Sequence, residues 1–101
     1  MYIEIDDHAR QHGITDPEIR SVMEYPLVSY HINSRSVSRD AELYRYIGDP
    51  SVVIEVVAED LGDDTYIAFH AMTLRTSVAL EAFENSGGTV DLRDEVTPQR
   101  R

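Results

Sequence analysis

The stretch HARQHGITDPEIRSVMEYP, residues 8–26, carries the strongest local structural signal in the chain. Thr15 and Glu18 have the spacing of a capping box, in which each side chain binds the backbone N–H of the other at the start of a helix. Pro17 suits the first helical turn, where a missing N–H costs nothing. Pro26 disfavours helical geometry in the residue before it. The stretch therefore predicts a helix that begins after Thr15 and ends just before Pro26.

The first half of the same stretch predicts a shorter helix. Residues 8–12 are enough for about one and a half turns. Asp6 or Asp7 can cap its start, since a carboxylate accepts from the free N–H groups there. Gly13 can end it by turning left-handed without steric cost. The preceding residues, MYIEI, favour a short strand or an extended entry into this helix.

The rest of the chain predicts strands followed by one helix. Strand patterns, rich in β-branched and aromatic residues, occur in LVSYHI (27–32), AELYRYIG (41–48), SVVIEVVAE (51–59) and TYIAFHAMTL (65–74). Short connections between the later strands favour antiparallel pairing. The pattern of TSVALEAFEN (76–85), with Ser77 or Thr76 as its cap, predicts the last helix.

These elements predict an α+β fold in a single domain. We expect two N-terminal helices packed on a three- to four-stranded antiparallel sheet, followed by a C-terminal helix. The chain has 101 residues, which suits one domain. We assign that domain to residues 1–86, and we expect residues 87–101 to form a flexible tail because they contain few apolar side chains.

Composition narrows the classes of function. The chain has no cysteine, which excludes disulfides, zinc–thiolate sites and cysteine nucleophiles. It has no apolar run of the roughly 20 residues that a membrane helix needs, and no secretory signal pattern, so we expect a cytoplasmic protein without membrane contact. Its net charge is −10, and residues 48–64 hold six acids and no base. This net charge does not exclude a basic surface formed by other parts of the chain.

Residues 8–84 resemble, in order and spacing, the BrnT-like toxins of type II toxin–antitoxin systems. The resemblance lies in HARQHGITDPEIRSVMEYP, in RYIGDPSVVIEVV and in IAFHAMTLRTSVALEAF. That family belongs with the RelE/ParE-like toxins, which implies a compact RelE-like α+β fold. Many members cleave messenger RNA and are held inactive by an antitoxin, whereas some relatives act on gyrase. The resemblance implies an antitoxin-like partner, and RNA or the ribosome as a target.

Metal-independent RNA cleavage needs a base, an acid and a cation or N–H donors at the phosphate. His70 suits the acid or base because histidine titrates near neutrality, and Arg75 and Arg45 suit the phosphate because a guanidinium matches its oxygens. We predict these three residues as catalytic. The alternative is structural, with His70 partly buried and hydrogen-bonded and Arg75 solvated.

A second group of residues is predicted to bind the substrate. Tyr46 and Tyr44 can stack on bases, or can instead pack with a solvated hydroxyl. His12 shares a predicted helix face with His8, and Arg10 lies between them. His12 and Arg10 are predicted to contact substrate, and one histidine could reach over the sheet to act in catalysis. The simpler alternative is a solvated helix surface.

The sequence gives no reason to expect a cofactor or a bound metal. It has no H-E-x-x-H motif, Gly-rich phosphate loop or dinucleotide fingerprint, and the acidic run at 59–64 lacks the spacing of a calcium loop. The leading hypothesis is a toxin that acts as a metal-independent ribonuclease on messenger RNA. The alternative, favoured by the acidic charge and the absence of lysine, is a non-catalytic protein-interaction module. An exposed sheet edge could also pair two copies as a homodimer.

Overall fold

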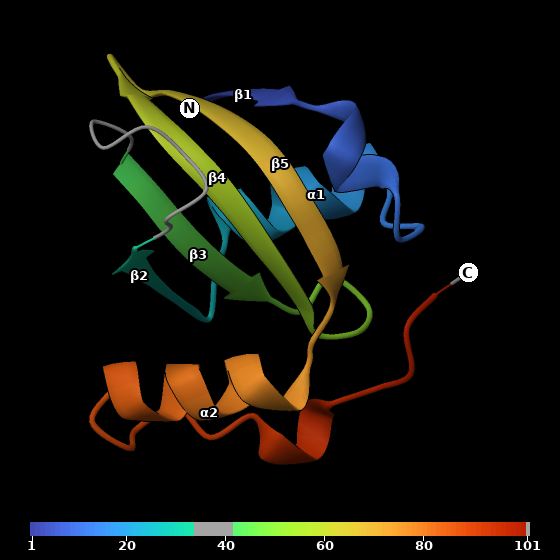
Figure 1. Ribbon diagram of the computed structural model, residues 1–101, viewed down its shortest axis with the longest axis vertical. Helices are drawn as coiled ribbons and strands as arrows, with labels where there is room; N and C mark the ends of the chain where they lie inside the picture. The colour runs from blue at the N-terminus through green and yellow to red at the C-terminus, as the bar shows by residue number, and fades with distance from the viewer. Residues whose placement is uncertain (34–41, 101) are drawn as a thin grey trace.

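The computed structural model describes residues 1–33 and 42–100. Within these residues, five strands form one sheet in the order β1-β5-β4-β3-β2 (Figure 1). The strands are β1 (Tyr2–Ile5), β2 (Val28–Ile32), β3 (Glu42–Gly48), β4 (Ile54–Gly62) and β5 (Thr65–Thr73). β4 lies at the centre, as expected for the most apolar stretch. The predicted strand at 41–48 is confirmed from Glu42 onward, and Ala41 lies outside the described residues.

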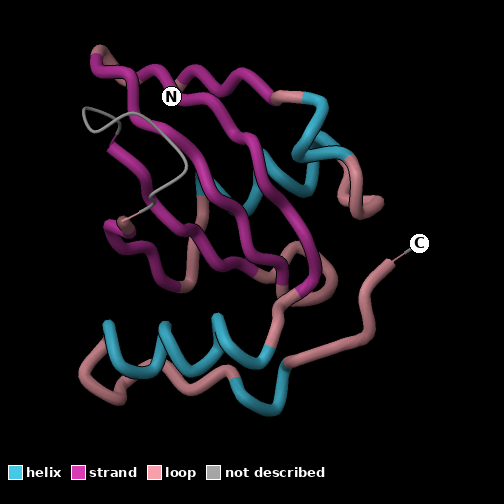
Figure 2. The backbone as a smooth tube through the Cα atoms, viewed as in Figure 1, coloured by secondary structure: helices cyan, strands magenta, loops and turns pink. Residues whose placement is uncertain are grey.

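The sheet is mixed. β2, β3, β4 and β5 pair antiparallel with their neighbours, and for β3, β4 and β5 the short connections predict this pairing. β1 instead runs parallel to β5, with Tyr2 opposite Thr65 and Ile5 opposite Ala68. In Figure 2 these two strands run side by side although more than half of the chain separates them. Parallel pairing of this kind depends on a long connection and not on a local turn.

One face of the sheet is covered by the N-terminal segment. The capping box is present, and α1 (Asp16–Glu24) starts and stops where the sequence predicts. Its apolar side packs on the sheet and forms the larger core, which includes Ile19, Val22, Met23, Tyr46, Ile54, Val56, Ala68 and Ala71. Burying these side chains stabilises the fold by roughly 1.5–3 kcal/mol for each large one. Gly48 allows a close approach here, since a Cβ at this position would lie 3.1 Å from the Cα of Val22.

The other face is covered at only one end. α2 (Thr76–Asn85) lies along that end of the sheet in Figure 1. It forms a second, smaller core with Ile47, Val53, Leu74, Val78, Ala79 and Ala82. The predicted caps are wrong: the N-cap is Arg75, and it makes no side-chain capping bond. The remaining part of this face lies beside α2 and holds the site described below.

The predicted layout of the fold is wrong, although the α+β class is correct. The part of the chain that the structure describes contains two α-helices, one before β2 and one after β5, and not two N-terminal helices plus a third. The segment near His8 forms a 3₁₀ turn, η1 (Asp7–Arg10), capped by Asp6. It is too short to nucleate an α-helix before Gly13 turns left-handed at φ +76°. The sheet is mixed and five-stranded because β1 joins it through tertiary contacts.

The segment after α2 returns to the body of the protein. It forms a second 3₁₀ turn, η2 (Arg93–Glu95), and Gln99 then donates to the carbonyl of Thr73. Arg100 binds the carboxylate of Glu18 in α1 through both terminal nitrogens, at 2.7 and 2.8 Å. The domain boundary at residue 86 and a flexible tail stay predictions. No helix among the described residues is long and apolar enough to cross a membrane.

Candidate functional site

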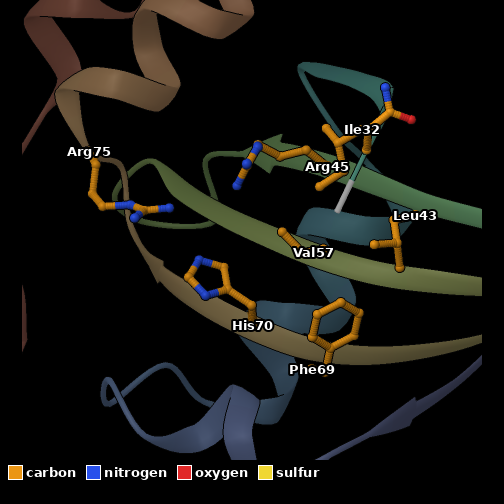
Figure 3. Close-up of a pocket in the computed structure, with 8 residues that line it drawn as sticks. Ile32, Leu43, Arg45, Val57, Phe69, His70 and Arg75 are labelled. Atoms are coloured by element: carbon orange, nitrogen blue, oxygen red, sulfur yellow. The ribbon is translucent and has the colours of Figure 1, made fainter. Parts of the chain in front are cut away.

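A groove lies on the sheet face that α2 covers only in part. Its volume is about 350 Å³. It is lined by Ile32, Asn33, Leu43, Arg45, Val57, Phe69, His70 and Arg75. Figure 3 shows that the side chains of Arg45, His70 and Arg75 point toward one another from separate segments of the chain. The groove therefore brings together the three residues that the sequence predicts as catalytic.

Strand register places one row of side chains across the groove. Tyr30 of β2 pairs with Arg45 of β3, Arg45 pairs with Val57 of β4, and Val57 pairs with His70 of β5. Side chains of directly paired residues lie on the same face of a sheet. The row therefore presents a phenol, a guanidinium, an isopropyl group and an imidazole in sequence, on the face opposite α1.

A β-bulge determines where His70 lies. The alternation of the sequence predicts His70 on one face together with Ala68. The structure instead pairs Ala58 with Ala68 and Val57 with His70, so that Phe69 is an extra residue in the strand. Ala68 lies in the core against α1, whereas His70 faces the groove. The predicted grouping of His70 with Ala68 on one face is thus wrong, because one inserted residue changes the alternation.

Glu55 of β4 is the centre of the cluster. Its side chain is fully buried, with 0% of its surface exposed. One oxygen, Oε1, accepts from Arg75 Nη2 at 2.6 Å and from Arg75 Nε at 3.0 Å. The same oxygen lies 3.0 Å from Nε2 of His70 and 3.6 Å from Nη1 of Arg45. The other oxygen, Oε2, accepts from the backbone N–H of Arg75 at 3.0 Å. One buried carboxylate therefore holds all three predicted catalytic residues.

Two opposed effects act on the pKa of the Glu55 carboxyl. Burial alone would raise this pKa, because a charge is costly away from water. The hydrogen bonds from His70 and Arg75 favour the ionised form and outweigh burial, so the pKa lies below its ordinary value. Glu55 is therefore a carboxylate at neutral pH. An ionised carboxylate can only accept, which assigns the hydrogen of the His70 ring to Nε2 and leaves Nδ1 as its basic nitrogen.

A second carboxylate ties the groove to α2. Glu81 accepts from Arg45 Nε at 2.7 Å and from the Tyr30 hydroxyl at 2.6 Å. Burial, followed by the bond to Glu81, raises the pKa of Tyr30 well above its ordinary value, so this phenol stays protonated. The side chain of Arg45 is only 11% exposed, whereas that of Arg75 is 42% exposed. Of the two arginines in the groove, Arg75 is thus the one whose guanidinium solutes can reach more easily.

His12 does not line the groove, but its ring lies beside that of His70. It lies between η1 and α1, and its ring centroid is 6.3 Å from that of His70 with an interplanar angle of 62°. Among the other residues predicted to bind substrate, Tyr44 and Tyr46 lie on the face that α1 covers and pack in the larger core. Burial, followed by nearby Tyr66, Asp60 and Tyr44, raises the pKa of Tyr46 to about 12.

Arg10 and His8 are engaged with nearby carboxylates. Arg10 donates to Asp7 at 2.7 Å and to Asp16 at 2.9 and 3.0 Å. Nδ1 of His8 lies 2.8 Å from a carboxylate oxygen of Asp6. Neither residue lines the groove. The structure thus brings together His70, Arg75, Arg45 and His12, and it places Tyr44, Tyr46 and Arg10 elsewhere.

Sequence reasoning missed the residues that organise the groove, namely Glu55, Glu81 and Tyr30. Glu55 did leave a signal, because it is the single charge within the apolar run SVVIEVV. A charge in a buried strand must be paired with an opposite charge, so Glu55 indicated that a positively charged side chain packs against this strand. Tyr30 and Glu81 left no comparable signal, since each lies in an ordinary amphipathic pattern.

The groove contains the parts for acid–base chemistry beside an anion. Among residues 1–33 and 42–100, no group of three histidine or acidic side chains is placed to hold a metal ion. Arg75 uses two side-chain N–H groups on Glu55, and its other donors have no partner within the described part of the chain. An imidazole held by a carboxylate beside such a guanidinium can move a proton while the guanidinium binds an oxyanion.

Comparisons of this chain with models of protein families, with curated proteins and with solved structures find no match. The chemistry of the groove is therefore the basis for a functional assignment.

Proposed function

We propose that this protein is a metal-independent ribonuclease of the toxin type, with its active site in the groove between β3, β5 and α2. The observation that carries the proposal is the convergence of His70, Arg75 and Arg45 on one concave surface. Sequence reasoning selected these three residues for RNA cleavage; Arg45 comes from β3, whereas His70 and Arg75 come from the stretch that ends β5 and begins α2. Both the BrnT-like resemblance and the groove chemistry support the same class of reaction.

In this mechanism Arg75 binds the scissile phosphate with the N–H groups that Glu55 does not use. A planar guanidinium suits two phosphate oxygens at once. His70 exchanges a proton with the ribose or with the leaving group through Nδ1. Glu55 fixes the His70 ring and stabilises it when it becomes positively charged, as a carboxylate does for a catalytic imidazole. Arg45, which also lines the groove, contributes positive charge there.

Cleavage of RNA by the purified protein, in buffer with a chelator to remove divalent metals, tests the proposal. We expect His70→Ala and Arg75→Ala to lower the rate by about 10²-fold or more. His31→Ala and Arg93→Ala are matched controls, since His31 pairs with Tyr44 on the opposite face and Arg93 binds Asp91 outside the groove. Equal rates for His70→Ala and the wild type would remove His70 from the mechanism.

Induced expression in a bacterial host tests the toxin assignment separately. We expect growth arrest with loss of messenger RNA, and normal growth with the His70→Ala variant. Arrest that persists in this variant would contradict a ribonuclease mechanism in the groove.

A second candidate is a non-catalytic protein-interaction module. The observation in its favour is that Glu55 and Glu81 neutralise the charges of Arg75 and Arg45, in a chain of net charge −10. A groove without net positive charge attracts RNA weakly. Retention on immobilised RNA distinguishes the two candidates. A ribonuclease binds and elutes with rising salt, whereas an interaction module with no affinity for RNA flows through.

A further inference from the structure

The turn that links η1 to α1 places the ring of His12 beside that of His70, which lines the groove. Gly13, directly after it, has a left-handed φ of +76°, and the carbonyl of Gly13 accepts from Arg100 Nη1 at 3.2 Å. α1 then begins at its capping box, which fixes the other end of the turn. The backbone that directly follows His12 is therefore held in place. Its half-buried ring lies edge-on to the ring of His70.

We propose that His12 is a second catalytic residue of the ribonuclease site, acting as the general acid while His70 acts as the general base. The inference rests on the proposed function and deepens it. The geometry behind it is the 6.3 Å separation of the two ring centroids, beside the exposed guanidinium of Arg75. In the transition state the attacking 2′-oxygen and the leaving 5′-oxygen are both bonded to the same phosphorus, so two adjacent imidazoles suit the reaction.

The roles follow from the environments of the two rings. Nε2 of His70 donates to the buried carboxylate of Glu55, which fixes the ring and leaves Nδ1 to accept a proton. Within the described residues the ring of His12 has no carboxylate bonded to it, and it is the imidazole that lies next to His70. A ring oriented by a carboxylate suits the general base, and the adjacent ring is then available as the general acid.

The proposed step balances as follows. Nδ1 of His70 takes the proton of the ribose 2′-hydroxyl, and the 2′-oxygen forms a bond to phosphorus. The bond between phosphorus and the 5′-oxygen breaks, and that oxygen receives its proton from the His12 imidazolium. The products are a 2′,3′-cyclic phosphate and a 5′-hydroxyl end. Proton exchange with water then restores both rings.

The charged groups around the two rings come from four parts of the fold. His70 faces Glu55 of β4, Arg45 of β3 and the N-cap residue Arg75, and Arg100 lies at the carbonyl next to His12. Arginine side chains stay protonated throughout the usual pH range, and the lowered pKa of Glu55 keeps its carboxyl ionised. A general acid and a general base that act together give a bell-shaped dependence of the rate on pH, which we expect for the wild-type protein.

The test compares two RNA oligonucleotides of the same sequence, chosen after the wild-type cleavage position is mapped. One has an ordinary linkage at that position, and the other has sulfur in place of the bridging 5′-oxygen. A thiolate leaves without protonation, so loss of a general acid should affect only the oxygen linkage. The variants are His12→Gln, His70→Gln and the control His8→Gln, whose ring is bound by Asp6 outside the groove. Thermal melting of each variant establishes that it is folded.

We expect His12→Gln to slow cleavage of the ordinary linkage by about 10²- to 10⁴-fold and to slow cleavage of the sulfur linkage by about 10-fold or less. It should also remove the alkaline limb of the pH–rate profile. His70→Gln should slow both substrates, and His8→Gln neither. Equal slowing of both substrates by His12→Gln would overturn the assignment as general acid. An unchanged rate would remove His12 from catalysis and leave the proposed function intact, whereas inactive wild-type protein would overturn the function itself.

Discussion

Glu55 and Arg75 are joined by three hydrogen bonds, two to the guanidinium at 2.6 and 3.0 Å and one to the backbone N–H of Arg75 at 3.0 Å. This arrangement does more than pair two charges. The backbone bond fixes the residue at which the chain leaves β5 and enters α2. The side-chain bonds orient the guanidinium at the edge of the groove. One carboxylate thus sets both the start of α2 and the position of a predicted catalytic group.

Replacing Glu55 with Ala should therefore destabilise the protein. The variant loses a buried carboxylate and leaves Arg75, His70 and the nearly buried Arg45 without their common partner. We expect a loss of about 3 kcal/mol in the free energy of unfolding, measured by urea denaturation. The control is Glu59→Ala on the same strand and face, where the side chain is half exposed and the change should be about 0.5 kcal/mol or less. A loss of unfolding free energy for Glu55→Ala as small as that expected for Glu59→Ala would show that the Glu55 cluster is not important for stability.

The contact between Glu18 and Arg100 should make stability depend on pH. The Arg100 guanidinium, helped by the hydrogen bonds from Thr15, lowers the pKa of Glu18 from 4.5 to about 2. A carboxyl whose pKa is lowered by folding contributes stability above its unfolded pKa, and this contribution is lost as pH falls toward the folded value. Arg100→Ala should thus lower the unfolding free energy by about 1 kcal/mol at pH 7. The difference from the wild type should shrink between pH 4.5 and pH 2.

Urea denaturation of the two proteins across this pH range checks the prediction. A constant difference between Arg100→Ala and the wild type, or a difference that grows as pH falls, would contradict it. Arg20→Ala is a suitable control because Arg20 donates to the backbone carbonyl of Ile3, which does not titrate over this pH range.

Deleting Phe69 should be tolerated better than deleting Ala71. Phe69 is the extra residue of the bulge, so its removal leaves His70 on the groove face and Ala68 in the core. Deleting Ala71 would instead move Met72 and every later side chain of β5 to the opposite face. We expect a cost of about 2 kcal/mol or less for the first deletion and above about 4 kcal/mol for the second, measured by urea or thermal unfolding. A Phe69 deletion that unfolds the protein would contradict this account of the bulge.

Gly48→Ala should weaken the packing of α1 on the sheet. The added Cβ would lie 3.1 Å from the Cα of Val22, and a backbone atom can yield only if the helix moves. Overpacking of this kind costs about 1–3 kcal/mol. Thermal unfolding measures the loss, and an unchanged midpoint would show that the interface adapts without cost.

Several parts of this fold were predictable because the information is local. The boundaries of α1 follow from Thr15, Glu18 and Pro17, which act on neighbouring backbone groups. The four antiparallel strands follow from their apolar pattern and short connections. The layout as a whole was not predictable, since β1 pairs with a strand more than 60 residues away and nothing in its own sequence specifies that partner. The first predicted helix failed because a few residues before a glycine do not hold an α-helix without tertiary support.

The sequence by itself determined the α+β class and the capped helix α1, and it offered histidine and arginine side chains as candidates for acid–base chemistry, because these depend on residue type and on neighbours in the chain. Only the tertiary structure decided which of those residues meet. The bulge at Phe69 directs His70 to the groove, the register across β2, β3, β4 and β5 aligns it with Arg45, and the buried Glu55 binds Arg75. Each of these depends on distant strands packing together, and a single extra residue reverses the face on which a side chain lies.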